Sequence, residues 1–431
     1  MKTFQTWSKT PPMGWNSWDC YGAGIDEAHL RANADFMAKH LKTYGWEYVV
    51  CDIQWSEPDV IGHRYRPFAD LTMDGFGRLL PAEKRFPSAK DGQGFKPIAD
   101  YVHALGLKFG LHMMRGIPRQ AVSQNVPILG TDKTAREIAH TFSVCPWNTD
   151  MYGLQNCAAA QSYYDSVIAL YASWGVDFIK CDDICVTEFR KWDNPYTADY
   201  EIEMLRSAID RCGREIVLSL SPGPAPRDKA DHLRQNANMW RMSGDFWDTW
   251  EALLHMFTLC EQWQGITSPG SYPDCDMLPL GLLLDDEDGN VNMRATRFTK
   301  PEQVTMMTLW GIFQSPLMIG GDLPTCDEWT LSLLTNERYT EMVKSVRGAK
   351  QFSRAKEQII WTANGKRSKY IAVFNIGEKE KTMRVPLDDI LLPDTAYRVT
   401  DVWSGECLGS TKNTLRLAVD PHGARLLKIE N

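Results

Sequence analysis

A lysine and an aspartate two positions apart, Lys180 and Asp182, are the first residues of this chain that could carry out chemistry. They lie at the end of the apolar run DFIKCDD, which predicts a buried strand, so both side chains point to one face. Charged side chains on the inner face of a barrel are costly unless they are paired or bind a polar group. The pair is either a structural ion pair or a carboxylate kept ionised by an ammonium group, which could act as a nucleophile.

A second charged pair, Arg241 and Asp245, flanks a short run that ends at Gly244. Asp248 is most simply interpreted as the N-cap of a following helix, whereas Asp245 lies before the first turn and can face outward. Two carboxylates from different strand ends are the minimum set for glycoside hydrolysis, in which one attacks and the other protonates the leaving oxygen. Four tryptophans could form sugar-facing walls, although a core position is the simpler interpretation of each: Trp18, Trp55, Trp247 and Trp250.

The elements that must position these residues follow a repeated pattern. Four helix-like segments end in Gly and turn into a short apolar run, at residues 45–52, 106–112, 175–183 and 213–221. The Gly supplies a left-handed helix cap, and the apolar run is typical of a strand in a parallel sheet. Helices alternating with buried strands predict an α/β fold, and in a parallel barrel the chemistry lies at the carboxyl ends of the strands. Those ends hold Asp52, His112, Lys180, Asp182 and Ser221.

The chain divides into a mixed α/β part and a strand-rich part. Further helices are predicted near residues 97–105, 198–211, 249–263 and 301–314. Long irregular loops are predicted at residues 56–95 and 113–131, and loops of that length are often functional. Beyond residue 348, short alternating runs separated by turns predict an antiparallel β-sandwich. We therefore predict a parallel barrel over residues 1–347 and a sandwich over residues 348–431.

The composition excludes several classes of partner. The chain has 431 residues, 24% of them charged, and a net charge of -8 with scattered basic residues, so neither nucleic acid nor an anionic membrane is an expected partner. The N-terminal stretch lacks the apolar region of a secretory signal and no run could span a membrane, so we expect a cytoplasmic protein. The 11 irregularly spaced cysteines indicate buried thiols rather than a zinc site. The sequence does not determine the oligomeric state, and a homo-oligomer is one of the alternatives.

The segment TPPMGWNSWDCYG at residues 10–22 resembles the opening of glycoside hydrolase family 27, the α-galactosidase or melibiase family. Similar segments follow in family order across nearly the whole chain: YVVCDIQW, the strand with Lys180 and Asp182, WRMSGDFWD, GSYPDCDMLPLG, MTLWGIFQSPLMIGGDL and PHGARLLKI. The resemblance implies a (β/α)8 barrel followed by an antiparallel β-sandwich. It also implies a retaining glycosidase that acts on a glycoside or oligosaccharide and needs no metal or organic cofactor.

The resemblance also assigns roles to individual residues. Asp182 matches the family nucleophile and Asp245 the general acid/base. Lys180 and Arg241 match sugar-binding cations, and Trp18 matches the aromatic wall of the sugar site. Asp52 matches a carboxylate that holds sugar hydroxyls, and Asp276 matches a carboxylate near the sugar ring. His112 stands at a position where many members have Tyr.

The chain departs from the family pattern directly after Asp52. α-Galactosidases carry two consecutive Asp residues there, and the second accepts a hydrogen bond from the hydroxymethyl arm of the sugar. Ile53 cannot accept that bond, and an unpaired buried hydroxyl costs about 1–3 kcal/mol. β-L-Arabinopyranose is the galactose ring without this arm, so the chain resembles the β-L-arabinopyranosidases of the family. The alternative is that Ile53 points into the core and another residue serves this position, which would leave an α-galactosidase.

A second departure is SLSPGPA at residues 219–225, where small residues replace bulkier ones near the sugar C2 position. Ser221 and Gly223 could leave room for an N-acetyl group, as in α-N-acetylgalactosaminidases, or the segment could be a tight proline-rich turn. Two other classes stay open. A metal-dependent barrel enzyme would also gather carboxylates, but Lys180 and Arg241 would repel its ion. A non-catalytic sugar-binding protein would not need both Asp182 and Asp245.

Overall fold

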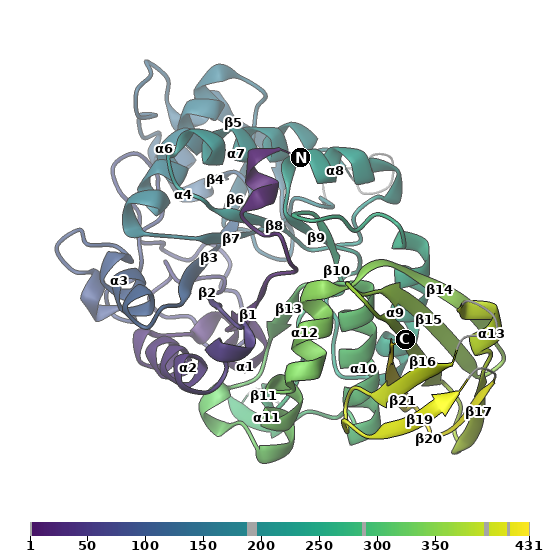
Figure 1. The fold of residues 1–431 in the computed structure, drawn as a ribbon. Coiled ribbons are helices and arrows are strands. Elements are labelled where there is room, and N and C mark those ends of the chain that lie inside the picture. Colours follow the sequence, from purple (N-terminus) through teal and green to yellow (C-terminus); the bar gives the residue numbers. More distant parts are fainter. Residues whose placement is uncertain (1, 188–195, 287–289, 392–395, 412–413, 431) are drawn as a thin grey trace.

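The chain passes from a barrel of strands surrounded by helices to a strand-rich C-terminal region, as the ribbon in Figure 1 shows. The computed structural model describes residues 2–430 apart from 188–195, 287–289, 392–395 and 412–413. In this part of the chain, none of the helices has the length and apolar character needed to cross a membrane.

Eight parallel strands form the barrel, in the order β10-β9-β8-β7-β3-β2-β1-β13. Their bounds are β1 (Met13–Asn16), β2 (Tyr48–Cys51), β3 (Lys108–Met114), β7 (Phe178–Asp182), β8 (Val217–Leu220), β9 (Met239–Arg241), β10 (Tyr272–Asp274) and β13 (Leu317–Ile319). A parallel bridge between Leu278, which follows β10, and Ile319 of β13 joins the two edges of the sheet. Leu278 donates its N–H to the Met318 carbonyl at 2.8 Å, so the sheet closes and the predicted barrel is confirmed.

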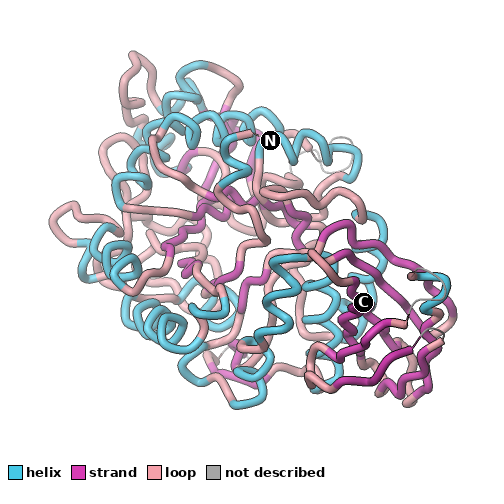
Figure 2. The backbone as a smooth tube through the Cα atoms, in the orientation of Figure 1, coloured by secondary structure: helices cyan, strands magenta, loops and turns pink. Residues whose placement is uncertain are grey.

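Helices cover the outside of the barrel, as the cyan segments of Figure 2 show. They are α2 (Glu27–His40), α3 (Lys96–Ala104), α6 (Ala158–Trp174), α7 (Asp199–Arg211), α8 (Ala230–Asn236), α9 (Trp250–Trp263), α10 (Lys300–Phe313), α11 (Glu328–Leu334) and α12 (Glu337–Ser345). Gly45 and Gly175 follow helical turns with φ values of 102° and 93°, a left-handed conformation that favours glycine. Both lead directly into barrel strands, as the sequence predicts.

Two insertions follow the carboxyl ends of barrel strands and therefore lie toward the mouth of the barrel. After β3, three short strands form an antiparallel sheet: β4 (Ile117–Pro118), β5 (Ala139–Val144) and β6 (Met151–Leu154), with α4 (Arg119–Gln124) and α5 (Ala135–Ile138) between them. After β10, the strands β11 (Leu282–Asp285) and β12 (Asn292–Ala295) form a hairpin. The prediction of an irregular loop at 113–131 was therefore wrong, because β4 and α4 are too short to produce a periodic pattern.

The C-terminal region is an antiparallel sandwich of a six-stranded and a two-stranded sheet. The larger sheet contains β14 (Arg347–Ala355), β15 (Gln358–Asn364), β16 (Lys369–Asn375), β21 (Ala424–Glu430), β18 (Tyr397–Asp401) and β19 (Cys407–Thr411), and the smaller one pairs β17 (Lys381–Val385) with β20 (Leu415–Val419). A short helix, α13 (Leu387–Ile390), follows β17. The two sheets enclose an apolar core that includes Ile371, Val385 and Val419. We propose residues 1–347 and 348–431 as the two domains.

Helix α10 lies between the barrel and the sandwich in Figure 1 and makes much of the contact between them. Phe313 of α10 packs edge-on against Trp361 of the sandwich, with ring centroids 6.1 Å apart. Phe257 of α9 packs in the same way against Phe374, at 4.9 Å. Aromatic contacts of this kind bury large apolar surfaces, so they hold the two parts together.

Candidate active site

Four of the predicted site residues are joined by direct contacts at the carboxyl ends of β2, β3 and β7. The Lys180 ammonium donates to Asp52 Oδ2 at 2.9 Å and lies 3.9 Å from Asp182 Oδ2. His112 Nε2 lies 2.8 Å from the same Asp182 oxygen. The register of β3 and β7 places His112 beside Lys180, which explains why these side chains meet. The Lys180–Asp182 pair thus belongs to a larger charged cluster rather than to an isolated ion pair.

Asp182 is held in its ionised form. Burial alone would raise its pKa, but the positive charge of Lys180 and then that of His112 hold the pKa well below its ordinary value. Asp182 Oδ2 is occupied by these contacts, whereas the buried Oδ1 has no hydrogen-bond partner among the described residues. A charged carboxylate with one oxygen anchored and the other unpaired is what a nucleophile requires.

Arg241 organises a second group of carboxylates at the ends of β9 and β10. Its Nη2 lies 2.5 Å from Asp276 Oδ2 and 3.3 Å from Asp245 Oδ1. The Asp276 side chain also accepts backbone N–H groups of Phe246 and Met277, each at 2.7 Å. Burial raises the pKa of Asp276 to about 7 against the opposing charge of Arg241, and the charges of Asp245 and Asp274 add to the rise. The Asp276 carboxylate is thus a buried acceptor held by Arg241 and two backbone N–H groups.

Asp245 differs from the other carboxylates in its exposure. Its side chain is 57% exposed, whereas Asp182 and Asp276 are buried. A solvent-accessible carboxylate can exchange protons with water, as a general acid/base must. The charges of Asp182, Asp52 and Asp245 all act on the hydroxyl of Tyr65, whose pKa is raised by burial first and then by these carboxylates. The Tyr65 ring lies at the barrel mouth, where it stacks on Trp18 with ring centroids 6.0 Å apart.

A small cavity lies between Lys180 of the first group and Arg241 of the second, and neither Asp182 nor Asp245 is among its lining residues. Its volume is about 20 Å³, and its lining includes Lys180, Ser221, Arg241 and Asp276. Asn16 lines it as well and donates its amide to Asp52 Oδ2 at 2.6 Å. The structure therefore brings these residues of the predicted set to the inside of the barrel mouth.

Trp18 packs against an apolar cluster that contains Ile53, and Ile53 lines a separate small cavity together with His112 and Met114. Ile53 is 2% exposed and packs with Met114 and Cys145, among others, and the rings of Trp18, Tyr65 and Trp147 cover the cluster. Trp18 stacks on Tyr65 with ring centroids 6.0 Å apart. The backbone N–H of Ile53 donates to Asp52 Oδ1 at 2.8 Å, so the two residues are fixed relative to each other. The residue that follows Asp52 is therefore apolar and is surrounded by apolar side chains.

One sequence interpretation near the site was wrong, whereas two of the four tryptophans occupy packing positions, the simpler interpretation of each. Asp248 does not cap α9, because Thr249 is the N-cap, and Asp248 is instead buried and paired with Arg294 at 2.6 Å. Trp55 is a core residue that donates its indole N–H to the His112 carbonyl at 2.8 Å. Trp250 stacks on His422 of the sandwich, with ring centroids 3.7 Å apart. These two tryptophans therefore serve packing rather than a sugar wall.

Some residues that contact the site were not predicted from the sequence. Asn16 follows the Gly and Trp of the β1 strand, and its place at a strand end could have revealed it. Tyr65 and His63 come from the long 56–95 loop, where no local pattern predicts their position. His63 is held by Asp286 at 3.1 Å and packs against Trp18 at 4.8 Å. Asp286 follows the β11 strand, so that contact depends entirely on the fold.

The cluster could in principle hold a metal ion. Asp52, His112 and Asp182 each offer a ligand atom, and these atoms lie within 4.8 Å of one another. The Lys180 ammonium, however, lies against both carboxylates, and its charge would repel a divalent cation placed among them. The arrangement suits a sugar bound by hydrogen bonds better than an ion.

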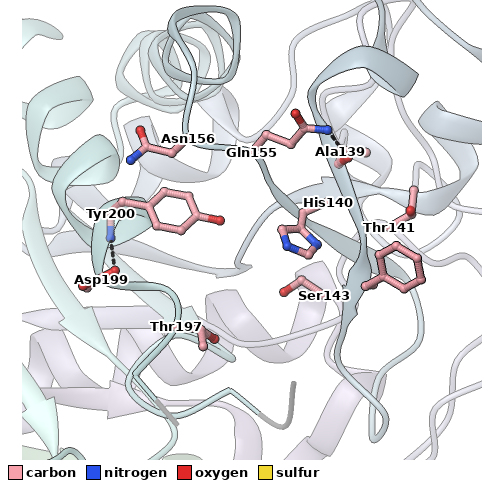
Figure 3. A pocket seen from close by; sticks show the side chains of 10 residues that line it. Ala139, His140, Thr141, Ser143, Gln155, Asn156, Thr197, Asp199 and Tyr200 are labelled. Carbon is pink, nitrogen blue, oxygen red and sulfur yellow. Dashed lines mark hydrogen bonds between the residues drawn. The ribbon is translucent and has the colours of Figure 1, made fainter. Parts of the chain in front are cut away.

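A separate pocket of about 660 Å³ lies between the small antiparallel sheet and α7 (Figure 3). Its lining includes His140 and Ser143 of β5 and Tyr200 of α7, whose side chains face a common hollow in Figure 3. None of the residues predicted for catalysis or sugar binding lines this pocket. The chemistry expected from the sequence therefore lies at the barrel mouth.

Comparisons with known proteins agree with this geometry. Residues 148–344 match a family model described as alpha galactosidase A, and residues 355–429 match the alpha galactosidase C-terminal beta sandwich domain. An α-galactosidase of Coffea arabica is 28% identical over 97% of this chain and 93% of its own length.

Two similar solved structures have higher identities. A β-L-arabinopyranosidase of family 27 from Geobacillus stearothermophilus, solved as a variant with arabinose, is 53% identical with a TM-score of 0.96, over 100% of this chain and 99% of its own. A Bacillus halodurans protein proposed to be an α-N-acetylgalactosaminidase is 49% identical with a TM-score of 0.87, over 97% of both chains. Given this similarity along the full length, the chain belongs to glycoside hydrolase family 27 and is a glycosidase.

Proposed function

We propose that the protein is a retaining exo-glycosidase that releases terminal β-L-arabinopyranosyl residues. Asp182 attacks the anomeric carbon while Asp245 protonates the departing glycosidic oxygen, so that the bond to the aglycone breaks as a glycosyl ester forms. Asp245 then removes a proton from water, and the resulting hydroxide displaces Asp182 and restores the original configuration. The low pKa and unpaired Oδ1 of Asp182, and the exposure of Asp245, support these roles.

The remaining residues bind and orient the sugar. Asp52, Lys180 and Arg241 provide acceptors and donors for ring hydroxyls, and Asp276 provides a further carboxylate acceptor that Arg241 holds in place. Trp18 offers an apolar face to the C–H groups of the ring, His112 fixes the nucleophile, and Ser221 lines the cavity between Lys180 and Arg241. No step in this mechanism requires a metal or an organic cofactor.

The pentose preference rests on one observation, the apolar surroundings of Ile53. The residue after Asp52 packs with Met114 and Cys145 under the rings of Trp18, Tyr65 and Trp147, so the site lacks the second carboxylate there, and a hydroxymethyl group near Asp52 would lose its water without gaining that acceptor. That loss costs about 1–3 kcal/mol, or roughly a factor of 5 to 150 in kcat/KM. The Geobacillus stearothermophilus relative, a β-L-arabinopyranosidase, supports the same choice.

The second candidate is an α-N-acetylgalactosaminidase, because the Bacillus halodurans neighbour carries that name. The small residues near Ser221 motivate the same interpretation. Packing argues against it, since a Cβ at Gly223 would lie 2.3 Å from the Ser243 carbonyl. The glycine therefore serves a close backbone approach rather than leaving space for an N-acetyl group.

Initial rates on three nitrophenyl glycosides test the proposal: the β-L-arabinopyranoside, the α-D-galactopyranoside and the α-D-N-acetylgalactosaminide. We expect the highest kcat/KM on the arabinopyranoside, by about tenfold or more over the galactoside. The first product seen by NMR should keep the anomeric configuration of the substrate. A faster reaction on either hexoside, or a first product of inverted configuration, contradicts the corresponding part of the proposal.

We also propose a cytoplasmic location. All 11 cysteines are unpaired, and the closest pair, Cys260 and Cys275, has its sulfur atoms 3.6 Å apart. Free thiols in this number are typical of a reducing compartment.

A further inference from the structure

Arg115 is a buried arginine that contacts the backbone of the candidate nucleophile Asp182 and the residue after it. It follows β3, is 2% exposed, and its guanidinium contacts only protein groups among the described residues. We propose that Arg115 is a positioning residue that fixes the backbone and the direction of Asp182 through a network with Asp183, Glu201 and Tyr164. The inference rests on the proposed function, because it concerns how the nucleophile of that reaction is held.

Arg115 contacts both residues at the end of β7. Its backbone N–H donates to the Asp182 carbonyl at 3.0 Å, which extends the β3–β7 pairing past the strand end. Its Nε donates to the Asp183 carbonyl and its Nη2 to Asp183 Oδ2, both at 2.7 Å. Asp183 has a φ of 57°, a left-handed conformation uncommon outside glycine. Arg115 thus makes three hydrogen bonds, one from its backbone and two from its side chain, and they hold Asp182 and Asp183 at the end of β7.

The remaining guanidinium nitrogen, Nη1, is bound by a residue of a helix outside the barrel, which a residue of a second helix holds in turn. Arg115 Nη1 donates to Glu201 Oε1 of α7 at 2.8 Å, and Glu201 is fully buried. The Tyr164 hydroxyl of α6 donates to Glu201 Oε2 at 2.6 Å and accepts the Gly116 N–H at 2.9 Å. Two helices outside the barrel therefore fix the guanidinium, which in turn fixes the strand end.

This network is more than a means of stabilising the fold. Buried ion networks often add little stability over apolar packing, but they impose a specific geometry. Three bonds of this network reach Asp182 and Asp183, the candidate nucleophile and the residue after it, and a strained backbone held at such a place is typical of functional sites. The planar fork of arginine is essential, because a lysine could not bond the Asp183 carbonyl, the Asp183 side chain and Glu201 together.

Arg115→Lys tests the proposal in the full-length enzyme. A displaced nucleophile slows attack without weakening sugar binding, so we expect kcat to fall by about a hundredfold while KM stays within about twofold. Tyr164→Phe removes one hydroxyl and keeps the ring, so it is the milder variant if Arg115→Lys does not fold. We expect it to lower kcat by about tenfold, again with little change in KM.

Arg214→Lys is the matched control. Arg214 pairs with Asp177 at 2.5 Å and donates to the Val176 carbonyl at 2.8 Å, at the opposite end of the segment that contains β7. It should keep wild-type kcat even if its melting temperature falls. Wild-type kcat per folded molecule in Tyr164→Phe and in any Arg115→Lys that folds would overturn the positioning role, as would an equal loss of kcat in Arg214→Lys.

Asp182→Ala separates this inference from the proposed function. If Asp182→Ala turns over like the wild type, the proposed nucleophile is wrong. If Asp182→Ala is inactive while Arg115→Lys and Tyr164→Phe keep wild-type kcat, the nucleophile stands and only the positioning role fails.

Discussion

His112 and Asp182 share a direct hydrogen bond, with Nε2 and Oδ2 2.8 Å apart. Because an ionised carboxylate can only accept, the imidazole must carry its proton on Nε2. The bond occupies the same oxygen that faces Lys180 at 3.9 Å, whereas Oδ1 has no hydrogen-bond partner among the described residues. If Asp182 is the nucleophile, as we propose, His112 thus leaves Oδ1 for the attack.

Asp245→Asn should make the rate depend on the leaving group. The variant cannot protonate the departing oxygen, so a poor leaving group is lost slowly, whereas dinitrophenolate needs no proton. We expect kcat/KM on an alkyl arabinopyranoside to fall by about a hundredfold or more, with a much smaller loss on the dinitrophenyl glycoside. Steady-state kinetics on both substrates measure this difference. Equal losses on both would exclude Asp245 as the acid.

Ile53→Asp should shift the preference toward galactose. The new carboxylate would lie beside Asp52 and could accept the hydrogen bond of the hydroxymethyl group. We expect the ratio of kcat/KM on the α-galactoside to that on the β-L-arabinopyranoside to rise by about tenfold or more. Ile53→Val, which stays apolar, is the control and should keep the wild-type ratio. The idea fails if both variants show the same ratio.

Lys180→Met should move the acidic limb of the pH profile. Burial raises the pKa of Asp182, and the charges of Lys180 and then His112 reverse that effect and hold it low. Without Lys180 the effect of burial dominates, so the pKa of Asp182 rises and kcat/KM is lost at higher pH than in the wild type. Lys180→Arg keeps the charge and should leave the limb in place. If the acidic limb of the pH profile lies at the same pH in both variants, Lys180 does not control the pKa of Asp182.

Chelators should leave activity unchanged. Asp52, His112 and Asp182 lie close enough to bind an ion, but the Lys180 ammonium already neutralises the carboxylates. We expect equal rates in buffer with and without EDTA, and no stimulation by added zinc or manganese. Loss of activity in EDTA that an added metal restores would instead favour a metal-dependent enzyme.

His422→Ala should destabilise the contact between the barrel and the sandwich. The imidazole stacks on Trp250 at 3.7 Å and bonds Glu302 of α10 at 2.7 Å. Loss of the stack and of one partly buried hydrogen bond should cost about 1–3 kcal/mol, seen as a lower melting temperature. His255→Ala on the exposed face of α9 is the control. A similar shift in both variants would assign no special role to His422.

The barrel was predictable because its segments carry local signals. Gly45 and Gly175 mark helix ends, and the helices predicted at 249–263 and 301–314 are Trp250–Trp263 and Lys300–Phe313. In the sandwich, alternating runs mark strands such as Gln358–Asn364 and Lys369–Asn375 but not Arg347–Ala355 or Cys407–Thr411. The last two lie at the edges of their sheet, where one side has no partner strand and the alternation of apolar residues is weak.

The site was only partly predictable. Asp52, His112, Lys180 and Asp182 follow apolar runs, so their place at the mouth could be inferred from the chain alone. Arg115 and Glu201 are 86 positions apart, and no spacing rule connects them before the barrel is closed. The same holds for His63 and Asp286, whose contact joins a loop after β2 to the end of β11.

The seam of the barrel has a consequence for biosynthesis. Asp276, which we propose binds the sugar, precedes by two positions the Leu278 residue that bridges to Ile319, so it lies next to the contact that closes the barrel. The outer edge of β1 pairs with Leu317–Ile319, so this edge cannot be paired before that segment has been synthesised. We therefore expect a chain that ends before Leu317 to leave the barrel open beside Asp276.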